Sequence, residues 1–232
     1  MSISQHSRSR RELGTPNTEA VEDYAKAIHA LADRDGGPVS TTALAARLGV
    51  SPGSVTAMLK RMDEMRLVSH EPYHGATLTP AGERVALEVI RHHRLIEAYL
   101  AEALGMPWDR VHEEAEVLEH YISEDLEERI AAALGDPARD PHGDPIPDRE
   151  LALAGEEGVP LLELTAEAEG TFSRVSDGDP EMLRYLDERD IRPGARVRVT
   201  GRQPFGGPLI VVFDGAEHAI GDELARRMLI SV

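Results

Sequence analysis

The apolar positions of this chain follow a helical period over most of its length and change to short alternating runs near the end. Residues 18–35 carry apolar side chains at helical spacing from Val21 to Leu31. Thr18 is a candidate N-cap and Gly36 a stop signal. This segment therefore predicts the first helix.

The next segment predicts a winged helix-turn-helix. Two amphipathic stretches are separated by a glycine-containing turn and followed by two β-rich runs, which is the order of elements in that DNA-binding domain. The predicted elements are a helix over 42–48, a turn at Gly49 and Val50, a helix from the N-cap Ser51 to about Met65, and strands at 67–69 and 76–79 around His74 and Gly75.

Residues 81–135 predict two long amphipathic helices, 81–105 and 109–135, each ended by a glycine. Their apolar positions cover enough surface for an internal core and for a partner helix. We therefore expect this region to form a homodimer.

The chain changes character twice after these helices. From 136 to about 163 it is rich in Pro, Gly and acidic residues, which is typical of a linker. Residues 164–232 show short strand patterns between glycine-rich turns, with one helix at 180–190, which predicts a small β-barrel. The fold class is thus mainly α with a small β domain. The predicted organisation is a flexible arm (1–17), a winged helix-turn-helix (18–80), a helical metal-binding and dimerisation domain (81–150), a linker (151–163) and a β-barrel (164–232).

Charge divides the chain into a balanced beginning and an acidic remainder. The net charge is -17, with 9 Lys and Arg against 8 Asp and Glu in residues 1–70, and 16 against 34 in residues 71–232. Because DNA is a polyanion, we expect a DNA-binding face within residues 1–70. No run approaches the roughly 20 apolar residues that span a bilayer. The basic N-terminus lacks the apolar segment of a secretory signal, so a cytoplasmic protein without membrane contact is expected.

Six potential metal ligands fall on the two helices of residues 81–135. Four of them stand at offsets 0, 4, 7 and 8 on the second helix, and at about 100° per residue these offsets share one face. The other two stand at i, i+4 on the first helix. Facing helices would then form a divalent-metal centre, whereas the alternative is a solvated acidic face. The candidates are His112, Glu116, Glu119 and His120 on the second helix, and His93 and Glu97 on the first.

The available ligand types limit the choice of metal. The chain has no cysteine, which excludes disulfides, thiolate zinc sites and iron-sulfur clusters. Imidazole and carboxylate groups suit Mn(II), Fe(II), Zn(II), Co(II) or Ni(II), and a carboxylate-rich set favours Mn(II). Since histidine must be neutral to bind a metal, binding should weaken as the pH falls through about 6.5.

Two other functions fit parts of the pattern. A winged-helix regulator can sense an organic ligand, in which case the acidic helix is merely solvated. A dimetal carboxylate enzyme uses paired Glu-x-x-His motifs in a helical bundle. The segment from Glu116 to His120 is not that motif and has no second copy, so we do not expect an enzyme.

The order of these regions, together with four motifs, resembles the diphtheria-toxin-repressor family of metal-dependent transcription regulators. The motifs are VEDYAKAIHAL, RHHRLIEAYL, VHEEAEVLEHYISEDLEERI and HGDPIP, and the resemblance runs from Thr18 to Val232. It implies a repressor of metal homeostasis genes, with an SH3-like third domain, that binds a two-fold symmetric DNA operator as a homodimer. It also implies Mn(II) or Fe(II) as corepressor, with Zn(II), Co(II) or Cd(II) as substitutes in vitro.

The resemblance also implies how the ligands are grouped. One site takes His93, Glu97 and His112, and a second takes Asp23, Glu116, Glu119 and His120. Iron-responsive members have Cys and Met where this chain has Glu116 and Asp23, and manganese-responsive members have carboxylates there. Lys26 departs from the two-domain manganese regulators, which place a Glu ligand at that position. An ion bound by Asp23 and by ligands on the dimerisation helices would fix the angle of the DNA-binding domain.

The third domain of the family sometimes donates Glu and Gln ligands to the first site. This chain has Thr171 and Arg174 there, and neither can replace them. We therefore expect the C-terminal domain to be dispensable for metal loading, unless Asp177, Asp179 or Glu181 reaches the site.

The helix that begins at Ser51 is the expected DNA-recognition helix. Its hydroxyl groups can contact phosphates near the helix N-terminus, and its basic residues extend the positive surface. Ala57 stands where iron-responsive relatives have Gln. Its methyl group can contact only thymine methyl groups, so direct base readout should be sparse. The candidates are Ser51, Ser54, Thr56, Ala57, Lys60 and Arg61.

Overall fold

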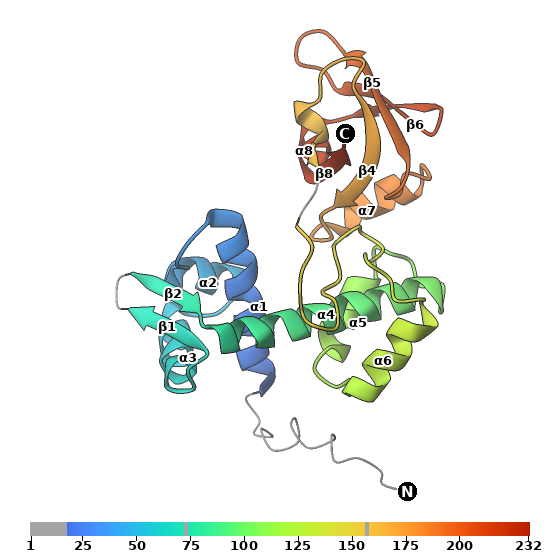
Figure 1. Ribbon diagram of the computed structural model, residues 1–232. Helices are drawn as coiled ribbons and strands as arrows, with labels where there is room; N and C mark the ends of the chain where they lie inside the picture. Colours follow the sequence, from blue (N-terminus) through green and yellow to red (C-terminus); the bar gives the residue numbers. More distant parts are fainter. Residues whose placement is uncertain (1–17, 72–73, 156–157) are drawn as a thin grey trace, which may run out of the picture. The chain divides into compact units, whose positions relative to one another are not determined.

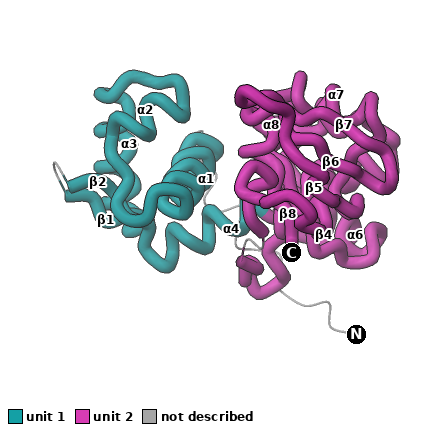
Figure 2. Tube along the Cα trace, turned by 90° about the horizontal axis from the view of Figure 1, so that it is seen from above, with its two compact units in different colours: residues 1–90 teal, residues 91–232 magenta. Residues whose placement is uncertain are grey.

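The computed structural model describes residues 18–71, 74–155 and 158–232, and the predicted arm 1–17 lies outside them. The chain divides into two compact units, residues 1–90 and 91–232 (Figure 2), which are described separately below. Among the described residues, no helix combines the length and apolar character that crossing a membrane requires.

The first unit is a winged helix-turn-helix (Figure 1). Its strands form a two-stranded antiparallel hairpin in which Val68 pairs with Leu78. The predicted elements of this region are confirmed, each within a few residues. They are α1 (Thr18–Asp35), α2 (Thr41–Leu48), α3 (Pro52–Glu64), β1 (Val68–Glu71) and β2 (Gly75–Leu78), followed by the start of α4 (Pro80–Glu102).

Local capping fixes where α2 and α3 begin. The Ser40 hydroxyl accepts from the Ala43 amide and ends the preceding extended segment. The Ser51 hydroxyl accepts from the Ser54 amide in the same way, with Pro52 in the first turn, where its missing N–H costs nothing. Between the two helices the chain turns at a left-handed glycine, as predicted.

The second unit begins with the last turns of α4 and continues with α5 (Val111–Leu118) and α6 (Glu124–Ala133). Two small apolar clusters hold these helices together. Leu95 of α4 packs with Ile130 of α6, and Ile96 of α4 packs with Val111 of α5. These clusters flank His93 and Glu97 on α4, so they set which way the two polar side chains face.

The single helix predicted over 109–135 is wrong, because the chain breaks after Leu118. Ser123 starts a new helix by accepting from the Leu126 amide, and acidic residues fill the first turn, where the helix dipole favours them. The Glu119 carbonyl instead accepts from Nδ1 of His92, at 3.2 Å. The apolar spacing continues across the break, which is why periodicity alone missed it.

The C-terminal part of the second unit is an antiparallel six-stranded sheet with strand order β3-β8-β4-β5-β6-β7. The sheet is open, since β3 and β7 do not pair within the described part of the chain. Strand β3 lies within the predicted linker, and helix α8 is additional to the one helix predicted for this domain. The elements are β3 (Val159–Pro160), a 3-10 turn (Leu161–Glu163), β4 (Glu169–Val175), α7 (Pro180–Asp187), β5 (Arg196–Arg202), β6 (Leu209–Phe213), β7 (Ala216–Ile220), α8 (Asp222–Arg227) and β8 (Met228–Ser231).

The Pro- and Gly-rich segment that follows α6, residues 136–150, has the composition of a linker but is packed into the second unit. Asp140, His142, Asp144 and Ile146 are buried, and the backbone of the segment bonds to β4 through the Val175 amide and the His142 carbonyl. Gly143 adopts a φ of +90°, and a Cβ there would lie 2.0 Å from the Ser173 carbonyl oxygen. The Pro/Gly-rich composition thus serves a tight ordered turn rather than a free connection.

Candidate metal centre

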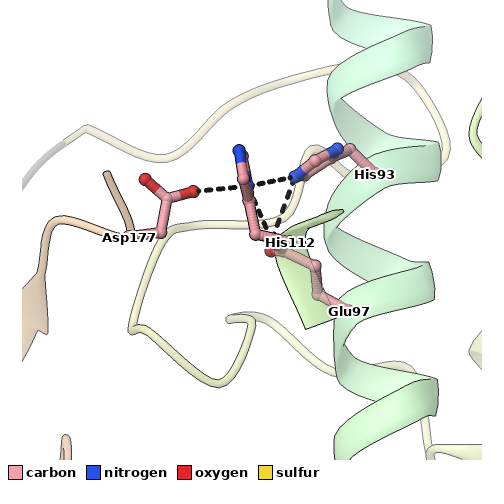
Figure 3. A group of neighbouring side chains, drawn as sticks. All are labelled: His93, Glu97, His112 and Asp177. Carbon is pink, nitrogen blue, oxygen red and sulfur yellow. Dashed lines mark hydrogen bonds and ion pairs between the residues drawn. The ribbon is translucent and has the colours of Figure 1, made fainter. Parts of the chain in front are cut away.

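Four side chains from three parts of the second unit converge on one point (Figure 3). His93 and Glu97 project from one face of α4, His112 comes from the first turn of α5, and Asp177 follows β4. His93 Nε2 lies 3.0 Å from Glu97 Oε1 and 3.1 Å from His112 Nδ1. His112 Nδ1 also lies 3.0 Å from Asp177 Oδ2. The structure therefore joins His93, Glu97 and His112, as predicted, and adds Asp177.

The charges of these groups support one another. Although burial opposes ionisation of Glu97, the neighbouring imidazoles of His112, His142 and His93 hold the pKa of its carboxyl well below the ordinary value. Contact with Asp177, and then with Glu97, raises the pKa of His112 to about 10. A positive charge is thus favoured among these carboxylates, and a divalent cation supplies the same charge more strongly than a proton does.

A second group of ligand atoms surrounds the other ring nitrogen of His93. Nδ1 lies 2.5 Å from Glu119 Oε2 and 3.8 Å from Glu116 Oε1. Glu119 also faces His120, whose Nε2 is 3.5 Å from Oε1. The family resemblance implies separate sites for His93 and for the two glutamates, whereas the structure brings both glutamates to within 3.8 Å of His93 Nδ1.

A third group is buried around Oε2 of Glu97, the carboxylate oxygen that does not face His93 and His112. Its members are Glu97, Asp140 and His142, which offer ligand atoms within 4.8 Å of one another. Glu97 Oε2 and His142 Nδ1 are buried without a hydrogen-bond partner and face each other at 3.7 Å. Two buried acceptor groups in this arrangement are costly unless a cation or proton lies between them. The residues present therefore fit a divalent cation.

Sequence reasoning missed Asp140 and His142 because their segment resembles a linker. The local signal that could have identified them is the sequence Asp-Pro-His-Gly-Asp at 140–144, which is typical of a tight turn. Asp140 Oδ1 accepts from the amides of His142, at 2.8 Å, and Asp144, at 2.9 Å, which shapes the turn. Burial and the charges of Asp144 and Glu97 raise the pKa of Asp140. Burial lowers the pKa of His142, but Glu97 and Asp140 outweigh it and raise that pKa to about 9.

The C-terminal domain contributes Asp177 to this cluster, which is the exception that the expectation from Thr171 and Arg174 allowed. Thr171 pairs within the sheet, and Arg174 Nη2 lies 2.8 Å from Asp144 Oδ1. Asp177 reaches His112, whereas Asp179 caps α7 through the amides of its first turn. Glu181, the third residue considered, is exposed on α7.

The predicted DNA-binding residues all lie on α3 or at its cap. The side chains are exposed except for Val55, Leu59 and Met62, which pack inward, and Met58 and Arg61, which are half-buried. The hydroxyls of Ser51 and Ser54 lie 2.9 Å apart, and the Thr56 hydroxyl donates to the Pro52 carbonyl. The predicted ligand Asp23 lies on α1, in the first unit.

Comparison with known proteins matches three consecutive regions of the chain to family models. Residues 17–76 match the iron dependent repressor N-terminal DNA binding domain, 79–148 the iron dependent repressor metal binding and dimerisation domain, and 159–232 the FeoA domain. The iron-dependent repressor IdeR of Mycobacterium tuberculosis is 32% identical over 224 residues, which cover 91% of this chain and 96% of IdeR.

Solved structures give the same picture. A manganese-dependent transcriptional repressor in complex with manganese is 40% identical, with a TM-score of 0.81, over 91% of this chain and 100% of that chain. ScaR with bound Zn²⁺ is 30% identical, with a TM-score of 0.73, over 91% of this chain and 99% of that chain.

Proposed function

The chain belongs to the iron-dependent repressor family, which includes the diphtheria toxin repressor, and we propose that Mn(II) is its corepressor. As a member it is a metal-dependent transcriptional repressor with a DNA-binding and a dimerisation domain, and it is not an enzyme. The organic effector and the dimetal enzyme that the sequence left open are set aside, because the relatives are metal-dependent repressors.

One observation carries the choice of manganese: the convergent ligand atoms are all nitrogen or oxygen. His93, Glu97, His112 and Asp177 offer two imidazoles and two carboxylates, and the chain contains no cysteine. Hard, oxygen-rich sites suit Mn(II) better than sites with thiolate. The similarity to a manganese-dependent repressor over 91% of the chain supports the same choice.

We propose that the first ion is held by His93, Glu97, His112 and Asp177. The bound ion would supply a fixed double positive charge in place of protons. The ion would take the place of the protons that now join Glu97 Oε1 to His93 Nε2, at 3.0 Å, and to His112 Nδ1, at 3.2 Å. The other oxygen of Glu97 would face a second ion position, lined by Asp140 and His142. Burial of Glu97 and Asp140 excludes water and strengthens the charge interactions that these two carboxylates make.

The ligand set that the sequence assigned to a further ion stays a prediction. It comprises Asp23, Glu116, Glu119 and His120. Support comes from the second unit, where Glu119 is buried between His93 and His120. Asp23 would couple this ion to the DNA-binding domain, so that metal loading sets the orientation in which α3 is presented to DNA.

Dimerisation is assigned to the apolar surface around the break between α5 and α6. Val117, Leu118, Tyr121 and Leu126 are large apolar side chains left exposed there, whereas Val111 and Ile130 fill the internal core. A two-fold dimer would cover them and place two α3 helices on a symmetric operator. Because a repressor acts on chromosomal DNA, a cytoplasmic location belongs to the proposal. Control of metal homeostasis genes is the second part of the same proposal.

Operator binding with and without metal tests the proposal. Fluorescence anisotropy on a two-fold symmetric operator should show tight binding with Mn(II) and loss of binding in excess chelator. Anaerobic Fe(II) in a parallel titration tests the iron alternative, which the similarity to IdeR favours. Glu97→Gln should abolish Mn(II) activation, and Glu114→Gln, an exposed glutamate on α5, should leave it unchanged. Specific binding in chelator would contradict a corepressor role for metal.

A further inference from the structure

Trp108 belongs by sequence to the helical domain but by packing to the C-terminal domain. It lies in the connection between α4 and α5 and is 1% exposed. Its indole is part of the core that lies against the six-stranded sheet, together with Leu161, Phe172 and Ile191. The C-terminal domain therefore holds a residue that precedes it by about fifty positions in the chain.

The same residue controls the ring of His142 in two ways. His142 Nε2 lies 2.8 Å from the Trp108 carbonyl oxygen, which can only accept, so Nε2 carries the proton and donates. The imidazole and indole rings stack with centroids 5.6 Å apart and planes 18° apart. These contacts leave Nδ1 as the nitrogen that faces Glu97 Oε2, at 3.7 Å.

Further contacts hold Trp108 and His142 to the C-terminal domain. The Arg192 guanidinium lies over the indole at 4.9 Å, and the Val175 amide donates to the His142 carbonyl at 2.9 Å. The Gly143 turn packs so closely on the Ser173 carbonyl that it admits no side chain. The imidazole of His142 thus has little freedom to rotate its Nδ1 away from Glu97.

We propose that Trp108 is a positioning residue for His142, through which the core of the C-terminal domain controls metal loading at the position lined by Glu97, Asp140 and His142. The inference rests on the proposed function, because it takes His142 as a metal ligand. A histidine that binds a metal through one nitrogen usually donates its other N–H to a fixed acceptor, and loss of such support typically lowers metal affinity about 10- to 100-fold.

Two substitutions in the full chain test the indole's role. Trp108→Phe keeps a flat ring against His142, whereas Trp108→Leu keeps apolar bulk but loses the stacking face. Mn(II) affinity is measured by isothermal titration and by electron paramagnetic resonance, and folding by circular dichroism in chelator. We expect the Phe variant to bind as the wild type does. The Leu variant keeps the main-chain carbonyl that accepts from His142 Nε2, so we expect it to lose about 10-fold in affinity at one equivalent of metal, the lower end of that range.

Phe213→Leu is the matched control, because Phe213 lies in the same core but makes its ring contacts with Phe172 and His218. It should lower thermal stability without changing Mn(II) affinity. Equal losses of affinity in Trp108→Leu and Phe213→Leu would overturn the proposal, since general loosening of the core would then explain both. Wild-type affinity in Trp108→Leu would overturn it as well.

Trp108 also reports on the site directly, because it is the only tryptophan of the chain. Titration of the wild-type protein with Zn(II), a diamagnetic ion, should shift its emission, and His142→Gln should remove that shift. If metal binding depends on His142 but leaves the emission unchanged, the positioning role of Trp108 is contradicted while the proposed function stands. Absence of any Mn(II) or Zn(II) binding contradicts the proposed function, and the inference with it.

Discussion

Replacing Asp177 with asparagine tests whether the C-terminal domain is a ligand donor. The change keeps the size of the side chain and removes one of the carboxylates beside His112. The His112 and Asp177 side chains are 37% and 33% exposed, so their ion pair in the metal-free protein should contribute only about 1 kcal/mol. Loss of a ligand from the Mn(II) site should cost at least about 10- to 100-fold in affinity, or about 1.4 to 2.8 kcal/mol.

Isothermal titration with Mn(II) measures this difference, and circular dichroism in chelator measures the stability of the metal-free protein. Asp190→Asn is the control, because Asp190 is exposed in the same domain and already adopts a left-handed conformation that asparagine tolerates. We expect a large loss of affinity with a small loss of stability for Asp177→Asn, and neither for the control. Identical Mn(II) affinities in the two variants would refute the ligand role of Asp177.

Three further predictions concern protons, metal choice and coupling. In the metal-free protein the raised pKa values of His112, about 10, and His142, about 9, mean that Mn(II) must displace protons even at neutral pH. Mn(II) affinity should therefore keep rising from pH 6.5 to 9, while the metal-free protein loses stability over that range, and a plateau above pH 7 would contradict this. Glu116→Cys should shift preference from Mn(II) toward Co(II) and Zn(II), because thiolate is a softer ligand, and competition titrations measure the shift. Asp23→Ala should reduce Mn(II)-dependent operator binding more than it reduces metal binding, whereas His120→Ala should reduce both; equal effects in the two variants would argue against a coupling role for Asp23.

The DNA-binding unit was predictable because its signals are local. Ser51 followed by Pro52 marks the start of α3 in the sequence itself, and the structure uses both as expected. The break between α5 and α6 was harder, since apolar spacing continues through Ile122 while Ser123 starts a new helix. Capping outweighed periodicity there, although Glu119 itself keeps helical dihedral angles and its amide still donates to the Ala115 carbonyl.

The members of the candidate metal cluster that lie on helices were predictable from the sequence. His93 and Glu97 stand at i, i+4, so helical geometry alone brings them together. Asp177 and His142 depend on contacts between the α4–α5 connection, a buried turn and the sheet. No local pattern encodes such contacts, and a turn rich in Pro and Gly has the composition of a linker. The neighbouring carboxylates raise the pKa of His112 above the ordinary histidine value, so the pH window that we now expect for Mn(II) binding lies higher than the sequence alone indicates.

Anomalous diffraction at the manganese absorption edge, from crystals of the full chain grown with Mn(II), locates the ion independently of any mutation. The proposed function predicts a strong peak among His93, Glu97, His112 and Asp177, in contact with side chains of both the helical and the C-terminal regions. Peaks found only at exposed carboxylates, with His93 and His112 still bonded directly to Glu97, would contradict it.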